Sequence, residues 1–273
     1  MDTRAVRRVV ATRPARDGAG VDIRRIAGDP DLDPFLMLDE FGSDDPEGYI
    51  AGFPEHPHRG FETVTYMLAG YMEHRDSTGR QGRLGPGDVQ WMTAGRGIVH
   101  SEMPMQASGR MRGFQLWVNL PAREKMGPPR YQEYAASAIP EVAGDGWRAR
   151  VIAGTCRGTT GAVSGIATSP TYLDVALASG HAFQQPVDDG HSALVYVYDG
   201  EVTIGEARVP AGQAAVLTAT GQVRVAADAD ASMLVLAGRP LGEPVVQYGP
   251  FVMNTREEIQ QALDDYRAGR IGQ

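Results

Sequence analysis

The sequence contains one cysteine, Cys156, in 273 residues. A lone cysteine excludes an intrachain disulfide and any metal site built from several thiolates of one subunit. This usage suits a reducing compartment. No paired histidine motif accompanies Cys156, so we interpret it as a small buried apolar residue and not as a catalytic thiol.

Long hydrophobic runs are also missing. A membrane-spanning helix needs about 20 consecutive apolar residues, and no stretch of this chain approaches that length. The apolar patch at 9–11 is too short for a secretory signal and is followed by Arg13. We therefore expect a cytoplasmic protein with no membrane partner.

The chain has no excess of positive charge. It carries 26 Lys and Arg against 34 Asp and Glu, which gives a formal net charge of -8. Nucleic-acid affinity depends largely on the neutralisation of phosphates, so we expect no direct nucleic-acid partner. One basic stretch near the start is interpreted as a solvated strand edge. Its members are Arg4, Arg7, Arg8, Arg13 and Arg16.

Turn-forming residues are plentiful: 34 glycines and 18 prolines separate short apolar runs along the whole chain. Many of these runs alternate with period two and contain β-branched or aromatic residues, which is typical of β-strands. The pattern predicts an all-β fold. Strands are expected at 63–68, 88–93, 113–119, 172–177, 193–198, 201–204, 214–217 and 233–236.

One segment near the C-terminus predicts a helix. Asn254 or Thr255 can cap it, and two glutamates in its first turn favour the positive end of the helix dipole. Gly269 follows as a stop signal. The apolar stripe is formed by Ile259, Ala262, Leu263 and Tyr266.

Two short clusters contain half of the six histidines. They read His56-Pro57-His58 and His100-Ser101-Glu102. Side chains at i and i+2 of a strand point to the same face, so each cluster forms a two-pronged grip. Two such strands would supply three nitrogens and one oxygen, which suits Fe, Mn, Co, Ni, Cu or Zn.

An internal repeat divides the chain into two similar halves. The run Tyr-Met-Leu-Ala-Gly at 66–70 precedes Pro-Gly-Asp at 86–88, and Tyr-Val-Tyr-Asp-Gly at 196–200 precedes Pro-Ala-Gly at 210–212. We interpret the halves as two copies of one β-unit.

The second copy lacks the metal-binding residues. Superposing the repeats places Pro186, Asp188, Val225 and Ala227 where the first copy has its two clusters. His181 and His191 are the histidines of that half, and we interpret both as surface or loop residues. The sequence therefore predicts one metal site in the first copy.

These motifs resemble those of the cupin superfamily and, more narrowly, of the pirins. The resemblance rests on His-Pro-His-Arg-Gly-Phe-Glu-Thr-Val-Thr-Tyr at 56–66 and on Gly-Asp-Val-Gln-Trp-Met-Thr-Ala-Gly-Arg-Gly-Ile-Val-His-Ser-Glu at 87–102. It covers most of the chain, with the second half matching less specifically. It implies a bicupin, with two facing β-barrel domains of the jelly-roll type and a short C-terminal helix. Residues 1–133 would form the metal-binding cupin, and 134–273 a degenerate cupin that binds no metal and ends in the helix.

The resemblance implies one iron, Fe(II), held by His56, His58, His100 and Glu102. In the general cupin pattern the carboxylate ligand follows the histidine pair by four residues, and here that residue is Glu62. Strand alternation would place Glu62 on the same face as His58, unless Gly60 breaks the register. We prefer Glu102 as the ligand, with Glu62 beside the site or at the surface.

The resemblance also implies a function. Several bacterial pirins are similar to quercetinases, so we expect an iron-dependent dioxygenase that opens the ring of a flavonol such as quercetin with O2 and releases CO. Glu102 would act as the catalytic proton acceptor. The alternative is a non-enzymatic, metal-containing regulator whose protein partner is a transcription factor or a metabolic enzyme. Sugar isomerisation, a third cupin activity, has no specific motif here.

Overall fold

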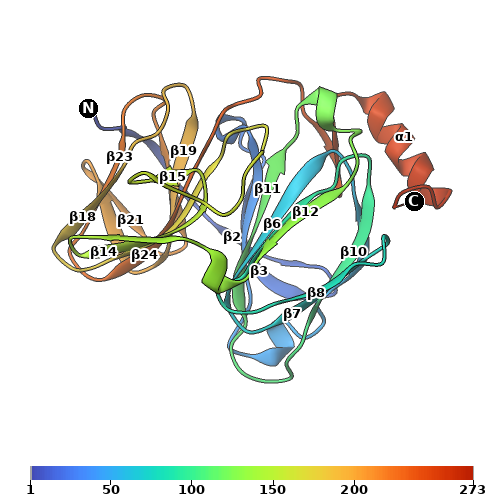
Figure 1. The fold of residues 1–273 in the computed structure, drawn as a ribbon, viewed down its shortest axis with the longest axis horizontal. Coiled ribbons are helices and arrows are strands. Elements are labelled where there is room, and N and C mark those ends of the chain that lie inside the picture. The colour runs from blue at the N-terminus through green and yellow to red at the C-terminus, as the bar shows by residue number, and fades with distance from the viewer. Residues whose placement is uncertain (1, 273) are drawn as a thin grey trace. The chain divides into compact units, whose positions relative to one another are not determined.

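The computed structural model describes residues 2–272, and most of this part of the chain forms β-strands (Figure 1). Two compact units are present. Unit 1 contains the chain up to Arg13, Gly28–Pro34 and Ser137–Pro240. Unit 2 contains Pro14–Ala27, Phe35–Ala136 and the chain from Leu241 onward. Compactness alone does not define a domain that folds by itself, so the division after residue 133 stays a prediction.

Unit 2 consists of two β-sheets and a C-terminal segment. Its seven-stranded sheet has the order β12-β9-β6-β11-β4-β3-β2, and its four-stranded sheet the order β5-β10-β7-β8. The strands of the first are β2 (Arg13–Asp17), β3 (Val21–Ala27), β4 (Phe35–Phe41), β6 (Phe61–Ala69), β9 (Val89–Thr93), β11 (Arg112–Asn119) and β12 (Arg130–Tyr134). Those of the second are β5 (Phe53–His58), β7 (Met72–Asp76), β8 (Gln81–Leu84) and β10 (Ile98–Pro104).

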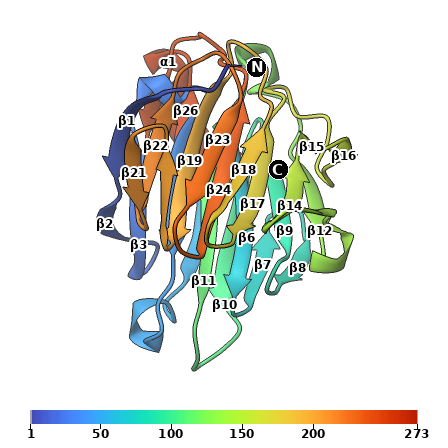
Figure 2. The same cartoon turned by 90° about the vertical axis from the view of Figure 1, so that its left-hand side faces the viewer.

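Unit 1 repeats this plan with a seven-stranded sheet, β1-β22-β19-β24-β17-β14-β13, and a four-stranded sheet, β18-β23-β20-β21. Figure 2 shows β1 beside β22 at one edge. The strands are β1 (Val6–Ala11), β13 (Glu141–Gly144), β14 (Trp147–Ala153), β17 (Thr171–Leu177), β18 (His181–Gln185), β19 (Ser192–Asp199), β20 (Glu201–Ile204), β21 (Ala207–Pro210), β22 (Gln213–Leu217), β23 (Val223–Ala227) and β24 (Ala231–Gly238). Each unit therefore consists of one larger and one smaller β-sheet, which agrees with the prediction of an all-β fold with two similar domains.

Short elements complete the two units. They are the ribbon β15 (Thr155–Cys156) with β16 (Thr159–Thr160), the hairpin β25 (Val246–Tyr248) with β26 (Phe251–Met253), and four 3-10 turns. The turns span Pro30–Leu32, Pro46–Gly48, Ala122–Glu124 and Ala136–Ala138. All eight predicted strands are confirmed within two residues at each end, because each was marked by β-branched residues between turn formers.

The internal repeat is also visible in the hydrogen bonds of the backbone. In unit 2 the Gly87 N–H donates to the Met67 carbonyl oxygen over 2.7 Å, where the chain enters β9 beside β6. In unit 1 the Gly212 N–H donates to the Val197 carbonyl oxygen over 2.8 Å, where the chain enters β22 beside β19. Both glycines have positive φ, which a side chain would disfavour. The two halves therefore fold as copies of one β-unit.

The interior of unit 1 is apolar where the repeat would place metal ligands. Val225 and Ala227 are buried in a large cluster of aliphatic and aromatic side chains. Cys156 belongs to the same cluster, and burial raises the pKa of its thiol. This confirms the interpretation of Cys156 as an apolar residue.

The single α-helix among residues 2–272 is α1 (Arg256–Arg267). Thr255 caps it: its hydroxyl accepts from the Glu258 N–H, and the Glu258 carboxylate accepts from the Thr255 N–H. Ile259 is buried against Phe251 in a small apolar cluster, as predicted. Tyr266 does not share this burial, since 45% of it is exposed at the end of the helix. No helix in this part of the chain has the length and apolar character to cross a membrane.

Arg4 contradicts the interpretation of the basic stretch as solvated. It is almost fully buried in unit 1, and burial lowers the pKa of its guanidinium group. The group donates four hydrogen bonds of 2.7–2.8 Å to the backbone carbonyls of Asp188, His191, Thr218 and Gly221. The following strand, β1, pairs with β22, so Arg4 joins the first residues of the chain to the second half.

Candidate metal centre

Three predicted ligands meet in unit 2. His56 and His58 lie on β5, and His100 lies opposite His56 on the antiparallel strand β10. One ring nitrogen from each histidine lies within 4.8 Å of the others. Strand geometry explains the cluster, because residues two apart on β5 share a face and the register brings His100 to that face.

The ring nitrogens of these histidines are available to a metal. The Nδ1 of His56 lies 2.8 Å from the Pro54 carbonyl oxygen, so it donates there and leaves Nε2 free. Neither ring nitrogen of buried His58, nor the Nε2 of buried His100, has a hydrogen-bond partner of normal geometry among the described residues. Buried polar atoms without partners are costly, and a metal ion would satisfy them.

Burial also keeps the imidazoles of His58 and His100 neutral, as metal ligation requires. It lowers the pKa of His58 and of His100 well below the usual value, and the neighbouring histidines lower it further. A hydrogen-bonding influence of the Pro250 carbonyl acts in the opposite direction on His58. The three side chains therefore present lone pairs toward one point.

Glu102 lies two residues after His100 on β10 and is 3% exposed. Its Oε1 lies 2.9 Å from the Thr65 hydroxyl, and its Oε2 accepts a 3.2 Å hydrogen bond from the Gln115 side chain. The carboxylate borders the same cavity as His56 and His58. Unlike the three histidines, Glu102 does not belong to the group whose ligand atoms lie within 4.8 Å of one another. Its roles as fourth ligand and as proton acceptor therefore stay predictions.

Glu62 lies on the other sheet of unit 2. Gly60 has a φ of +89° between β5 and β6, and this turn breaks the alternation that would align Glu62 with His58. The Glu62 carboxylate accepts a 2.7 Å hydrogen bond from the Thr93 hydroxyl. Burial raises its pKa to about 7. Glu62 is not among the residues that line the cavity or belong to the histidine cluster.

His74 is a further member of the site that the sequence motifs did not reveal. It lies on β7, opposite Glu102 on β10, and is 1% exposed. Its Nδ1 is 3.4 Å from the Nδ1 of His100, and its Nε2 is 3.1 Å from the Tyr131 hydroxyl. If Nε2 of His100 holds a metal, its proton lies on Nδ1 and can be donated to His74.

A cavity of about 590 Å³ is lined by His56 and His58, and all of its lining residues belong to unit 2. Its apolar wall includes Ile23, Met37, Phe41, Met72 and Trp117, and its polar groups include Arg25, Asp39, Glu102, Gln115 and Gln247. This volume falls within the roughly 300–1,000 Å³ that is typical of small-molecule sites.

An ion pair is among the polar groups that line this cavity. Arg25 donates to both carboxylate oxygens of Asp39, over 2.8 and 2.7 Å, and to Asp17. Burial raises the pKa of Asp39, and the hydrogen bonds from Arg25 oppose that rise. The paired groups keep hydrogen-bonding capacity toward the cavity without an isolated buried charge.

Comparison with known proteins identifies the family. The family model for Pirin matches residues 20–118, and that for the Pirin C-terminal cupin domain matches residues 172–272. The chain belongs to the pirin family. A pirin-like protein of Caulobacter vibrioides is 54% identical, over 99% of this chain and 100% of its own length. Human pirin is 45% identical, over 96% of this chain and 92% of its own.

A solved structure supports the same relationship. The quercetin 2,3-dioxygenase from Acinetobacter baumannii is 36% identical and superposes with a TM-score of 0.92, covering 98% of each chain. This pirin-family chain thus has the cupin fold and a cluster of one half-buried and two buried histidines that could hold a metal ion. Imidazole donors suit several divalent transition metals, so the donor set alone does not select one.

Proposed function

We propose that this chain is an iron-dependent dioxygenase that acts on a flavonol such as quercetin, opening the ring with O2 and releasing CO. The observation that carries the proposal is the cavity of about 590 Å³ bordered by His56, His58 and Glu102. The similarity of the whole chain to the quercetin 2,3-dioxygenase from Acinetobacter baumannii supports the substrate class.

In this proposal His56, His58, His100 and Glu102 hold Fe(II). Bound Fe(II) would supply a Lewis acid and a redox-active centre for the chemistry of O2. The buried imidazoles hold their lone pairs without competing protons, because burial lowers the pKa of His58 and His100. The protein thereby offers a ready set of nitrogen donors.

Glu102 takes the proton of the flavonol 3-hydroxyl group. Its carboxylate borders the cavity, within hydrogen-bond reach of a substrate hydroxyl placed against the histidines. Thr65 and Gln115 hold the carboxylate in position from the side of the barrel wall. Removal of this proton leaves the electron-rich enolate that O2 chemistry on the heterocyclic ring requires.

The remaining cavity residues orient the flavonol and keep water away. The ring of Trp117 and neighbouring apolar side chains contact the flat rings of the substrate, and Arg25 with Asp39 hydrogen bonds to phenolic hydroxyls at the other end. A lining that combines apolar side chains with several polar groups matches the chemistry of a polyhydroxylated aromatic molecule.

The decisive experiment measures O2 uptake and CO release with quercetin on protein whose bound metal has been quantified. Turnover that requires iron and disappears in His58→Ala is expected. If iron is bound but neither quercetin nor related enediols consume O2, the dioxygenase proposal is wrong. A regulatory role would then be tested by looking for a protein partner.

The choice of carboxylate ligand has its own test. We expect Glu102→Gln to lower iron content and affinity, because it removes an anionic donor beside His100, whereas Glu62→Gln keeps the iron. The two glutamates form a matched pair, since both are buried in unit 2. Iron lost only from the Glu62 variant would reverse the assignment. Iron content by elemental analysis provides the measurement.

A further inference from the structure

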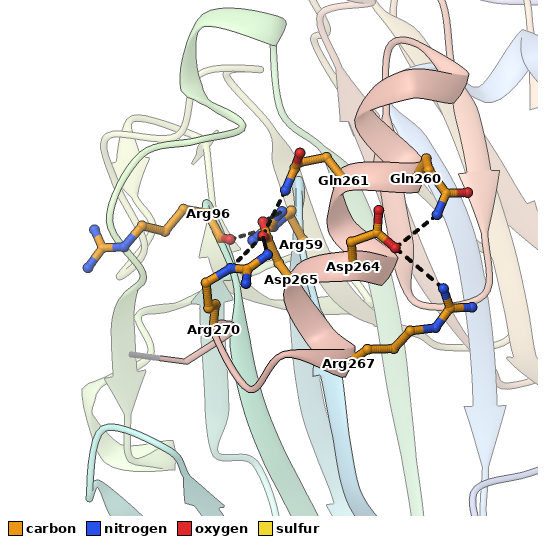
Figure 3. A network of polar contacts seen from close by, with 8 residues as sticks. All are labelled: Arg59, Arg96, Gln260, Gln261, Asp264, Asp265, Arg267 and Arg270. Atoms are coloured by element: carbon orange, nitrogen blue, oxygen red, sulfur yellow. Dashed lines mark hydrogen bonds and ion pairs between the residues drawn. The ribbon is translucent and has the colours of Figure 1, made fainter.

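Two neighbouring aspartates of α1 have different partners (Figure 3). Asp264 accepts hydrogen bonds from Gln260 and Arg267, which lie on the same helix. Asp265 accepts from Gln261 and from Arg270 in the same region, and in addition from Arg59 over 2.7 Å. Asp265 is thus the member of the pair that connects the helix to the strands of unit 2.

Arg59 directly follows the candidate ligand His58. Its Nε donates a 2.6 Å hydrogen bond to the Arg96 carbonyl oxygen, and its Nη1 forms the ion pair with Asp265 (Figure 3). The two paired side chains are only 5% and 14% exposed. A guanidinium group at that depth depends on its anion, since an unpaired charge there is strongly unfavourable.

The backbone after His58 is also held by the C-terminal segment. The Arg59 N–H donates to the Pro250 carbonyl oxygen, and the Arg59 carbonyl oxygen accepts from the Val252 N–H over 3.0 Å. The buried Lys125 ammonium donates to the carbonyl oxygens of Gly60 and Val252, over 2.7 and 3.0 Å. Contacts on both sides of Arg59 therefore hold the backbone that carries His58.

His58 depends on this backbone more than the other two histidines do. The Pro54 carbonyl orients the His56 ring, and His74 orients the His100 ring. His58 makes no side-chain hydrogen bond of normal geometry, and its ring packs against Phe61 and Trp117. Its direction is thus set by ring packing and by its own backbone.

We propose that Asp265 is a positioning residue for the metal site, which holds the His58 backbone in place through Arg59. The inference rests on the proposed metal site and adds the C-terminal helix to it. Loss of the Asp265 carboxylate leaves Arg59 buried without its anion. Arg59 then moves toward solvent, and the turn between β5 and β6 relaxes with His58.

The test compares Asp265→Asn with Asp264→Asn in the full-length protein, with Co(II) as the probe. Both variants remove one charge from neighbouring positions of α1, and only the first loses the partner of Arg59. Chelator competition measures Co(II) affinity, and the visible absorption of bound Co(II) reports ligand geometry. We expect about 10- to 100-fold weaker binding and an altered spectrum for Asp265→Asn. Asp264→Asn should stay within about twofold of wild type, because it leaves the ligands unmoved.

The outcomes separate the inference from the proposed function. A wild-type protein that binds no Co(II) and no Fe(II) would overturn the metal site itself. Wild-type-like Co(II) affinity and spectrum in Asp265→Asn would overturn the positioning role alone. The same holds if metal-free Asp265→Asn unfolds at a lower temperature than wild type but binds Co(II) with unchanged affinity.

If Asp265→Asn fails to fold, Asp265→Glu tests the positioning role instead, because it keeps a carboxylate but shifts its position. Intermediate affinity with an altered spectrum in that variant supports the positioning role. Wild-type affinity, or failure of both variants to fold, overturns it.

Discussion

At the scale of single residues, two buried glutamates of unit 2 differ in their surroundings. Glu102 borders a cavity, and its carboxylate has contacts with Thr65 and Gln115. Glu62 lies inside the wall, where burial raises its pKa to about 7 from an ordinary value of 4.5. The carboxyl group of Glu102 thus faces a cavity, whereas burial of Glu62 favours its protonated form.

The raised pKa of Glu62 predicts a pH-dependent stability. Between pH 4.5 and about 7 the folded protein keeps the Glu62 proton while the unfolded chain releases it, so this group's contribution falls as pH rises. Above pH 7 the free energy of unfolding is lowered by the full amount, up to about 3 kcal/mol. We expect metal-free Glu62→Gln to gain several degrees in unfolding temperature relative to wild type between pH 5 and pH 8. A pH-independent difference would contradict this explanation.

His74 predicts a second effect at this scale, on metal affinity. Its Nδ1 can accept the proton that His100 carries on Nδ1, which fixes the ring nitrogen that faces the metal. His74→Leu removes the acceptor and should weaken metal binding by about 10- to 100-fold. His74→Asn keeps a polar atom near the Nδ1 position and should recover part of the affinity. Chelator competition checks both, and equal affinities in the two variants would exclude the orienting role.

At the scale of elements, the strands and the helix could be predicted where the signal is local. Alternation marks the strands, and Thr255 with Glu258 marks the start of α1. The same alternation failed to place Glu62, because Gly60 turns the chain from one sheet into the other. A glycine in a motif indicates that the chain can turn there, but packing decides whether it does. At Gly60 a Cβ would lie 2.0 Å from the Val252 carbonyl oxygen, so only glycine fits this turn.

The cap of α1 predicts a local change in stability. Thr255→Ala removes the hydroxyl that accepts from the Glu258 N–H and should cost the helix about 1 kcal/mol. Amide hydrogen exchange in the first turn of α1 should become faster by about fivefold, and Thr255→Ser should restore protection. Unchanged exchange in the alanine variant would show that packing on Phe251 holds the helix without its cap.

At the scale of the whole molecule, each compact unit is built from segments far apart in the chain. The first residues join the unit formed by Ser137–Pro240, and the chain from Leu241 onward joins the unit formed by Phe35–Ala136. Two arginines contribute to this arrangement. Arg4 binds carbonyl groups of the second half in unit 1, and Arg59 binds Asp265 of the C-terminal segment in unit 2. Both ends of the chain therefore contribute to folded cores.

Arg4→Met should destabilise unit 1 by about 3 kcal/mol or more, because the variant leaves four carbonyl oxygens without their donor. Arg7→Met is the matched control, since Arg7 is half exposed and its ion pair with Asp31 is long, at 3.4 Å. Metal affinity should be unchanged in both variants, because His56, His58 and His100 all belong to unit 2. Thermal unfolding and chelator competition provide the two measurements, and a loss of affinity in Arg4→Met would refute this separation.

The sequence by itself determined the β-class, the repeat, the three-histidine cluster and the family. Each of these depends on residues close together in the chain or on motifs long enough to be specific. Only the tertiary structure decided that Glu62 is buried on the seven-stranded sheet away from the cavity. It also decided that His74 contacts His100 and that Asp265 pairs with Arg59. These contacts join residues far apart, up to 206 positions for Arg59 and Asp265. No local pattern encodes such a pairing, because strand register and the return of the C-terminal segment arise from packing of the whole unit.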